Sequence, residues 1–112
     1  MSLEDSKLTT FQKKVLELTK KIPKGKIATY GLLAKLLGDL HLSRAVGNAL
    51  NKNPFPIVVP CHRVVRSDGF VGGFAKGTEA KVELLKKEKI IINHNNKINL
   101  EKYLVNEKIL KK

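Results

Sequence analysis

Chain-breaking residues divide the first half of the sequence into three short segments, and this division limits the fold more than any other feature. Pro23 and Gly25 end the first segment, Gly38 ends the second, and Asn53-Pro54 ends the third. Within each segment, apolar residues recur every three or four positions, which is the spacing of an amphipathic helix. We therefore expect a mainly α fold with short β elements, in which short helices pack on one small core.

Capping residues mark where these helices are expected to begin. Thr9 and Gln12 form a capping box for the first helix, Thr29 caps the second, and Ser43 is expected to cap the third. The residues expected to face the core are Phe11, Val15, Leu18, Ile22, Leu32, Leu33, Leu36 and Leu37. Two short helices joined by a glycine-containing turn are typical of a helix-turn-helix, although any small helical hairpin would satisfy the same pattern.

The third helix has few large side chains. Val46 and Leu50 can anchor it to the core, whereas most of its remaining surface is small. The small residues are Ser43, Ala45, Gly47 and Asn48. Glycine at position 47 costs about 1 kcal/mol of helix stability relative to alanine. Either close approach to a binding partner or a tight helix–helix contact would account for it.

The second half begins with an extended segment and a glycine-rich loop. Residues 57–59 are β-branched, and we expect them to form a buried extended segment that leads into Cys61. Residues 66–77 are rich in glycine, which predicts a loop able to wrap a ligand with backbone groups. A helix capped by Thr78 is expected to follow, with Val82 and Leu85 facing inward.

The C-terminal residues 91–112 predict a hairpin about Asn95-Asn96 followed by a lysine-rich helix, and we find no chemistry in this tail. At 112 residues the chain is long enough for one modest core but not for two independent ones. We expect residues 1–112 to form a single domain and to act as a monomer.

The charge of the chain bears on its partners. Lys and Arg number 22 against 10 Asp and Glu, which gives a formal net charge of +12 and a pI near 10.0. So large an excess favours a polyanion as partner, because binding releases counterions. Lysines that serve only solubility would give the same excess.

Several classes of protein are disfavoured by composition. No apolar run approaches the roughly 20 residues that a bilayer requires, and the polar start of the chain lacks the apolar centre of a signal peptide. We expect a cytoplasmic protein with no membrane partner. The single cysteine excludes an internal disulfide, and the three histidines are too scattered for a cluster, so no metal is expected.

That single cysteine, Cys61, has two readings. A free thiol is only about 3% ionised at neutral pH, so a nucleophile needs a nearby base, a positive charge or a helix N-terminus. His62, Arg63 and a short helix starting after Pro60 could supply these. Cysteine is also among the residues most often buried inertly, and side chains adjacent in sequence frequently point apart. A redox couple is disfavoured because there is no second cysteine.

The stretch "PCHRVV" resembles the active-site signature of the O6-alkylguanine-DNA alkyltransferases, repair proteins that move an alkyl group from guanine onto their own cysteine. The stretches "ATYGLLAKLLG", "SRAVGNALNKNPFPIVVPCHRVV", "GFVGGFAKG" and "KVELLKKE" follow the same family's C-terminal DNA-binding and catalytic domain in order, over about residues 9–90. The resemblance implies a winged helix-turn-helix-like fold. It also implies a single-turnover methyltransferase that acts on double-stranded DNA without a cofactor.

The resemblance assigns chemical roles to five residues. Cys61 would be the alkyl acceptor, His62 would act through a water as its base, and Glu88 would stand behind the histidine. Asn53 resembles the asparagine that braces the turn before the active site. Tyr30 resembles the tyrosine that rotates the 3′ phosphate, contacts the base and helps the guanine leave. Without the motif, Glu88 would be read as a solvated helix charge and Asn53 as part of an ordinary Asn-Pro turn.

The resemblance also implies how DNA would be held. Arg44 would enter the duplex and fill the space left by the flipped nucleotide, while the third helix lies in the minor groove. The narrow groove would then explain the small side chains of Ser43, Ala45, Gly47 and Asn48. The carbonyls of Cys61 and Val64 and the amide of Ala75 would contact the lesion, and Gly72, Gly73, Phe74 and Ala75 would wall its pocket.

Two departures from the family pattern and two rival functions accompany this interpretation. The family usually carries an N-terminal domain, whereas eight residues precede the first helix here, and Phe74 stands where tyrosine is common. The first rival is an alkyltransferase-like protein, a class that lacks the reactive cysteine, holds alkylated guanine without transfer and hands it to other repair proteins. The second is a lysine-rich architectural DNA-binding protein, which would need neither Cys61 nor the pocket glycines. We expect the protein to act at the nucleoid, or in the nucleus of a eukaryote.

Overall fold

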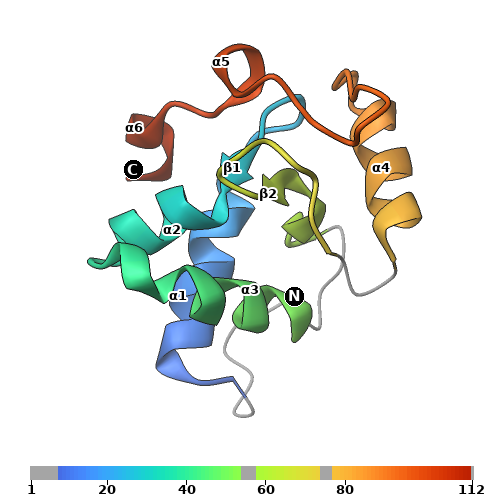
Figure 1. Ribbon diagram of the computed structural model, residues 1–112. Helices are drawn as coiled ribbons and strands as arrows, with labels where there is room; N and C mark the ends of the chain where they lie inside the picture. The colour runs from blue at the N-terminus through green and yellow to red at the C-terminus, as the bar shows by residue number, and fades with distance from the viewer. Residues whose placement is uncertain (1–7, 54–57, 74–76, 112) are drawn as a thin grey trace.

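The computed structural model describes residues 8–53, 58–73 and 77–111 (Figure 1). Its first half contains α1 (Thr10–Lys20), β1 (Ala28–Thr29), α2 (Tyr30–Leu36), the 3-10 turn η1 (Leu40–Leu42) and α3 (Ser43–Asn51). Its second half contains the 3-10 turn η2 (Cys61–Arg63), β2 (Val64–Val65), α4 (Thr78–Lys87), α5 (Leu100–Tyr103) and α6 (Glu107–Leu110). The expected mainly α fold with short β elements is confirmed.

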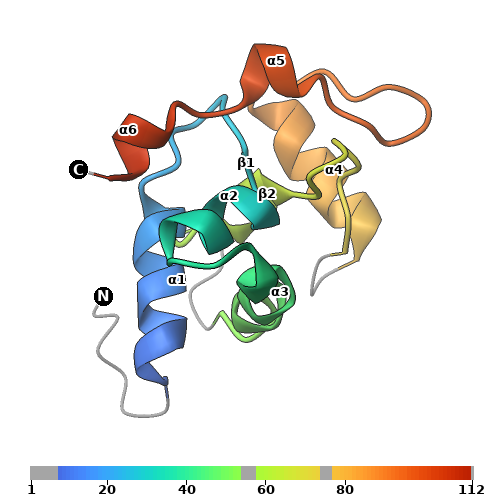
Figure 2. The same ribbon diagram turned by 60° about the vertical axis from the view of Figure 1, so that its left-hand side comes forward.

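The first three helices pack on one another, with α1 and α2 each in contact with α3 (Figures 1 and 2). The capping box of α1 is present, since Thr9 and Gln12 each accept a hydrogen bond from the other's backbone N–H. Thr29 caps α2 by accepting from the Leu32 N–H at 3.0 Å, and Gly38 with φ of +111° follows the end of α2. The α2–η1–α3 unit is the expected helix-turn-helix.

Two predicted caps are wrong for a shared reason. Ser43 and Thr78 are already the first helical residues of α3 and α4, whereas an N-cap residue must be non-helical. The 3-10 turn η1, which Asp39 caps, comes directly before α3, so the backbone is already helical at Ser43. The Ser43 hydroxyl donates to the Leu40 carbonyl instead. Gly77 stands before α4 with φ of +96°, and the Thr78 hydroxyl donates to the Gly72 carbonyl.

The two short strands separate two groups of buried residues. They run parallel, with Ala28 opposite Val64 and Thr29 opposite Val65. Side chains alternate along an extended chain, so Ala28 and Val64 enter one core with α1, α2 and α3, while Val65 enters a second core beneath α4. The pair therefore lies between the three-helix group and α4 (Figure 2), in the winged arrangement expected from the sequence.

The extended segment before Cys61 agrees only in part with its prediction. Val59 is fully buried in the first core, but Val58 is 46% exposed. Val58 lies in a turn, whereas Val59 forms a β-bridge, and only Val59 reaches the core. Ile57, expected to be buried with them, lies outside the described residues.

The C-terminal segment packs into both cores. The predicted hairpin is present as a bridge between Ile92 and Ile98, with Asn96 at φ of +58°. The single lysine-rich helix is wrong: two four-residue helices, α5 and α6, stand there instead. Between them the chain pairs with Ile27, which donates to the Tyr103 carbonyl and accepts from the Val105 N–H. Val105 and Leu110 enter the first core and Tyr103 the second.

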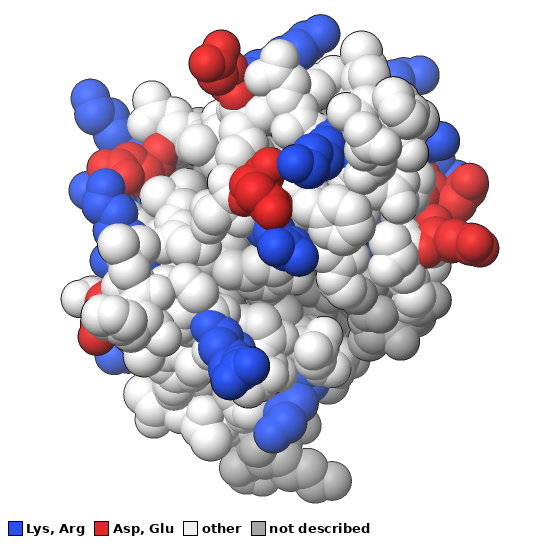
Figure 3. Space-filling model, viewed as in Figure 1, with Lys and Arg blue, Asp and Glu red and all other residues white. Residues whose placement is uncertain are grey.

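Basic side chains are distributed around the surface. On the face seen in Figure 3, Lys and Arg (blue) are spread over the molecule instead of forming one patch, with fewer acidic groups (red) among them. The electrostatic field of such dispersed positive charges attracts a polyanion but does not determine where the polyanion binds. None of the helices in the described ranges is both long and apolar enough to cross a membrane.

Candidate active site

Cys61 begins η2 and is partly exposed. Its backbone N–H donates to the Val59 carbonyl at 2.8 Å, which turns the chain sharply after Pro60. Its side chain contacts the edge of the first core without being enclosed by it. Because a 3-10 helix has three residues per turn, the side chains of Cys61, His62 and Arg63 diverge. Cys61 therefore stays partly exposed, while the side chains of His62 and Arg63 are 2% and 15% exposed.

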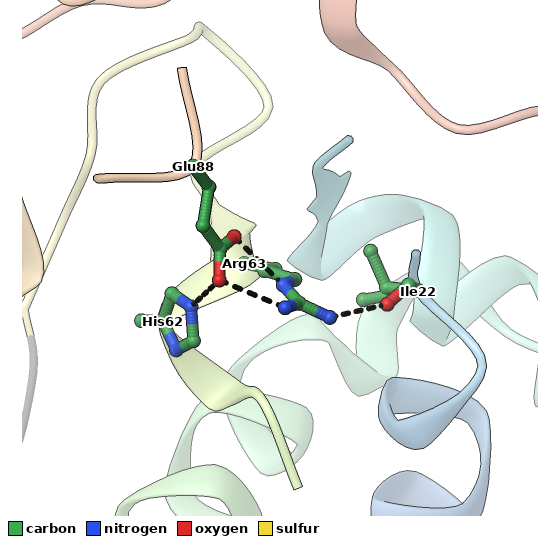
Figure 4. A network of polar contacts seen from close by, with 4 residues as sticks. All are labelled: Ile22, His62, Arg63 and Glu88. Carbon is green, nitrogen blue, oxygen red and sulfur yellow. Dashed lines mark hydrogen bonds and ion pairs between the residues drawn. The ribbon is translucent and has the colours of Figure 1, made fainter. Parts of the chain in front are cut away.

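His62 and Glu88 form the expected pair. The His62 ring is 2% exposed, and its Nε2 lies 2.9 Å from Glu88 Oε2 (Figure 4). A carboxylate only accepts hydrogen bonds, so Nε2 carries the hydrogen and Nδ1 keeps the lone pair. Glu88 directly follows α4, which brings it back over η2. The predicted position of Glu88 behind the histidine is confirmed.

Arg63 completes this group in a way that the sequence did not indicate. Its Nε and Nη2 each donate to Glu88 at 2.8 Å, and its Nη1 donates to the Ile22 carbonyl at 2.8 Å (Figure 4). The positive charge is thereby neutralised by Glu88, so Arg63 is not the free cation beside Cys61 that its place in the sequence suggested. Its function in the site is to hold the Glu88 carboxylate.

The protonation of the pair follows from these contacts. Burial, the largest influence, raises the pKa of Glu88, but the hydrogen bonds from Arg63 and His62 outweigh it, so the pKa lies below its usual value. Burial lowers the pKa of His62, and the opposing effect of Glu88 only partly compensates. At neutral pH Glu88 is ionised and His62 is neutral. The imidazole can therefore accept a proton.

Asn53 and Tyr30 lie on either side of the cysteine turn. Asn53 Nδ2 donates to the Val59 carbonyl at 3.0 Å, so it braces the segment before Cys61, as predicted. Tyr30 is the first residue of α2 and is half-buried. Burial raises the pKa of its phenol and the neighbouring Cys61 raises it further, so the hydroxyl keeps its proton.

A hollow of about 730 Å³ connects Tyr30 with α3 and with the turn after β2. Its lining residues are Tyr30, Ser43, Arg44, Gly47, Arg66, Ser67 and Asp68. Arg44 is exposed at the start of α3, and Asn48 is exposed one turn further on. Ala45 is half-buried, while Val46 faces the core as predicted. Ser43 and Gly47 of α3 thus line the hollow together with two exposed arginines, Arg44 and Arg66. Arg66 forms an ion pair with Asp68.

Among the residues that the structure describes, no neighbour of Gly47 excludes a Cβ atom. A Cβ atom built at this position would meet nothing nearer than the ring of Tyr30 at 3.9 Å, which is ordinary contact. Of the two explanations for glycine at this position, a tight helix–helix contact is therefore ruled out. Close approach of an external surface remains.

The other predicted pocket residues are described only in part. Gly72 has φ of +77°, and a Cβ there would lie 3.3 Å from the Arg66 side chain. Val64 is buried in β2, and its N–H donates to the Cys61 carbonyl. A carbonyl oxygen has two lone pairs, so that of Cys61 can accept a second bond. Phe74 and Ala75 lie outside the described residues.

Lys81, in α4, was missed by the sequence analysis. It is fully buried, and its Nζ donates to the Gly73 carbonyl at 3.1 Å and to the Tyr30 hydroxyl at 3.4 Å. One signal could have found it. Positions 81, 85 and 88 share one face of a helix, and that face was already expected to hold Leu85 and Glu88.

The fold and the site together define a helix-turn-helix domain that presents an accessible thiol beside a buried imidazole–carboxylate pair. Residues 10–90 match the family model described as 6-O-methylguanine DNA methyltransferase, DNA binding domain. The chain belongs to this family.

Individual relatives agree with that assignment. A methylated-DNA–protein-cysteine methyltransferase from Methanosarcina acetivorans is 50% identical over 80 residues, which cover 71% of this chain and 51% of the relative. Mycobacterium tuberculosis OGT in complex with DNA is similar with a TM-score of 0.71 and 40% identity, over 74% of this chain and 51% of that one. The chain spans about half the length of the curated relatives it matches.

One solved structure matches over nearly its whole length. S. pombe Atl1, in complex with damaged DNA containing O6-carboxymethylguanine, has a TM-score of 0.78 at 30% identity. The match covers 89% of this chain and 98% of that chain.

Proposed function

We propose that this protein repairs DNA by flipping O6-alkylguanine out of the duplex and transferring the alkyl group irreversibly to Cys61. The observation that carries the proposal is the accessible Cys61 thiol beside the His62–Glu88 pair, within a domain of this family. Relatives named methylated-DNA–protein-cysteine methyltransferases support it. Residues 1–112 would act as one domain, as a monomer, with each molecule reacting once.

The proposed chemistry is a displacement at the alkyl carbon. Neutral His62 takes the thiol proton through a water, and Glu88 stabilises the resulting imidazolium. The thiolate forms the sulfur–carbon bond, and the bond from carbon to guanine O6 breaks with its electron pair going to the base. Tyr30 gives its phenolic proton to that base. Asn53 keeps the turn fixed throughout.

The proposed DNA contact lies on α3 and the adjoining hollow. Arg44 fills the gap in the duplex while Ser43, Ala45, Gly47 and Asn48 face the minor groove. The hollow beside Tyr30 leads toward the flipped base, whose pocket would include the Cys61 and Val64 carbonyls, Gly72, Gly73, Phe74 and Ala75. Dispersed lysines supply affinity for any duplex, so raising the salt concentration should weaken binding steeply.

A second candidate is lesion binding without transfer. It is favoured by the similarity to Atl1, whose solved structure contains damaged DNA with O6-carboxymethylguanine. In that case the protein would mark alkylated guanine for other repair proteins. The presence of Cys61 with His62 and Glu88 behind it favours transfer. Either activity would place the protein at the nucleoid of a bacterium or archaeon, or in the nucleus of a eukaryote.

Intact-protein mass spectrometry after incubation with duplex DNA containing O6-methylguanine decides between the two. Transfer predicts that each molecule gains one methyl group and that fragmentation places it on Cys61. Cys61→Ala should bind the same duplex with unchanged mass. Unchanged mass in the wild type, together with binding selective for the lesion, would establish the second candidate and overturn the first. Unchanged mass together with binding indifferent to the lesion would overturn both.

A further inference from the structure

The C-terminal hairpin, residues 92–98, lies directly beside the hollow that α3 helps to form. Residues 66–68 line that hollow together with α3. The chain that follows them is fastened to the hairpin, since the Ile98 N–H donates to the Gly69 carbonyl at 2.9 Å. The hairpin therefore continues the surface of the hollow beyond residues 66–68, although it belongs to a segment in which the sequence analysis found no chemistry.

The exposed side of the hairpin carries hydrogen-bond donors and no acid. Residues 92–98 contain no Asp or Glu, and the exposed residues among them are Asn93, His94, Asn95 and Lys97. Lysine, asparagine and backbone N–H groups are the usual partners of phosphate oxygens in protein–DNA complexes. Within residues 8–53, 58–73 and 77–111, no acidic side chain forms an ion pair with Lys97. Its ammonium can therefore bind an external anion.

The backbone at Lys97 is fixed by contacts on both sides. An antiparallel bridge pairs Lys97 with Phe70. Within the hairpin, Asn93 Oδ1 accepts the Lys97 N–H at 3.0 Å and the Asn95 N–H at 2.9 Å. A side chain on an ordered backbone loses less conformational freedom on binding than one on a frayed tail. Lys97 is thus better placed for a defined contact than a lysine that only adds to solubility.

Asp68 shows that the charge of Lys97 acts at the edge of the hollow. Asp68 lines the hollow, and it forms an ion pair with Arg66 at 3.2 Å. The hydrogen bond from the Phe70 N–H is the largest cause that holds the pKa of Asp68 below its usual value, and the charges of Arg66 and Lys97 lower it further. Two cations against one anion leave this edge with a net positive charge.

We propose that the hairpin is a second contact for the DNA backbone, in which Lys97 binds a phosphate while α3 lies in the minor groove. The inference rests on the proposed function only through its partner, duplex DNA. Phosphate contacts fix the position of a protein on the duplex, and a flipped nucleotide requires the backbone around it to be held. Asp68 opposes the phosphates at this edge and so limits the affinity for undamaged DNA.

The first test compares Lys97→Gln with Lys108→Gln in binding to undamaged duplex, followed by fluorescence anisotropy over a range of salt concentrations. Lys108 is also exposed, but it belongs to α6, which lies away from the hairpin (Figures 1 and 2). We expect Lys97→Gln to bind about 5- to 10-fold more weakly at about 0.1 M salt, and the slope of log affinity against log salt to fall by about 0.9, the value for one phosphate contact. Lys108→Gln should keep the wild-type slope. Lys97→Arg, which keeps the charge, should bind as the wild type, and all variants should keep the wild-type melting temperature.

The second test locates the contact on the DNA. In the Cys61→Ala background, duplexes containing O6-methylguanine are compared after single phosphates are replaced by neutral methylphosphonates. Replacement of the phosphate that Lys97 binds should weaken binding when Lys97 is present and have no further effect in Lys97→Gln. Arg44→Ala should leave the response to that phosphate unchanged, because Arg44 acts at α3.

The third test has the opposite sign. Asp68→Asn keeps the oxygen that accepts the Phe70 N–H at 3.0 Å but removes the negative charge. Its affinity for undamaged duplex should rise by about 2- to 5-fold, which is the range of interactions between exposed charges. An unchanged or weaker affinity would exclude the opposing role of Asp68.

The outcomes separate this inference from the proposed function. Wild-type affinity and slope in Lys97→Gln would overturn the inference and leave the proposed function standing. Equal losses in Lys97→Gln and Lys108→Gln would also overturn it, because dispersed lysines would then account for the binding. A wild type that transfers no methyl group, combined with the expected loss in Lys97→Gln, would overturn alkyl transfer and support the hairpin contact. A wild type that does not bind duplex DNA would overturn both.

Discussion

The hydrogen-bonded relay behind Cys61 consists of His62, Glu88 and Arg63. It differs from the exposed side of α3 in one respect: the stability of the fold depends on the residues of the relay but not on those of α3. His62, Glu88 and Arg63 are tied to one another and to Ile22 by hydrogen bonds of 2.8 to 2.9 Å. On α3, Arg44 and Asn48 are exposed, and Gly47 has room for a larger side chain.

This difference indicates whether the residues of each region are needed for stability, for activity or for both. Residues of the relay serve the fold and the proposed chemistry together, so their loss should appear in stability as well as in activity. Within the described part of the chain, Arg44 and Asn48 on α3 are exposed and form no such side-chain hydrogen bonds, so their loss should appear only when DNA is present. Lys81 is the exception, since it is interior but disfavoured by the interior. Measuring stability and activity side by side therefore tests the comparison.

The largest stability effect is expected at the relay. Glu88→Leu removes the carboxylate that His62 and Arg63 share and leaves the Arg63 charge without its partner. We expect a loss of about 3–5 kcal/mol in the free energy of unfolding, measured by urea denaturation. Glu83→Leu, exposed on the same helix, should change stability by less than about 0.5 kcal/mol. Equal effects of the two substitutions would place the relay among ordinary surface contacts.

The pH dependence of stability should distinguish Lys81 from the relay. The pKa of Lys81 is about 8 in the folded chain against 10.5 for an unperturbed lysine. Between these values the unfolded chain binds more protons, so the free energy of unfolding must rise with pH, by about 3 kcal/mol in total. Lys81→Met should lack this rise and Lys86→Met should keep it, as followed by urea denaturation across that pH range. Parallel curves for all three proteins would show that Lys81 is not desolvated.

On α3, the strongest effect should follow loss of Arg44. Arg44→Ala should slow transfer from duplex DNA by about 10- to 100-fold, equivalent to about 1.4–2.7 kcal/mol. Its reaction with free O6-benzylguanine and its melting temperature should be unaffected, because the side chain is exposed. Lys52→Ala, which removes an exposed cation at the other end of α3, serves as the control for charge alone. Equal slowing with both substrates would remove the role in base flipping.

The smallest effect on the free energy of unfolding is expected at Gly47, where its sign distinguishes the two explanations for the glycine. Gly47→Ala should raise the free energy of unfolding by about 0.5–1 kcal/mol, because alanine favours the helix and the site has room for a methyl group. Binding to duplex DNA, followed by fluorescence anisotropy, should become weaker. A less stable variant would mean that the glycine is needed for interior packing. The contrast between the relay and the exposed side of α3 would then not hold at position 47.

The sequence predicted the features that local chemistry determines. The capping box at Thr9, the Thr29 cap and the turn at Gly38 each depend on a few neighbouring residues. The pairing of His62 with Glu88 joins residues 26 positions apart, and only the family resemblance made it predictable. No local pattern indicated it.

What the sequence did not predict depends on tertiary packing. Arg63 follows Cys61 and His62, but its direction is set by η2 and by Glu88 arriving from α4. Lys81 was missed because the residues that it contacts come from α2 and from the glycine-rich loop, which are distant in the sequence. The Ser43 and Thr78 caps were wrong by one residue because both residues are already helical: η1 leads directly into α3, and Gly77 is the N-cap residue of α4.

The hydrogen bonds between Ile27 and residues 103 and 105 have a practical consequence for anyone preparing this protein. A gene fragment cut at residue 90, where the family similarity stops, would delete Tyr103, Val105 and Leu110 and so uncover hydrocarbon on both sides of the strand pair. Such a fragment should aggregate on expression even though every residue assigned to catalysis is retained. The smallest unit that folds should therefore be longer than residues 10–90, the range that the family model matches.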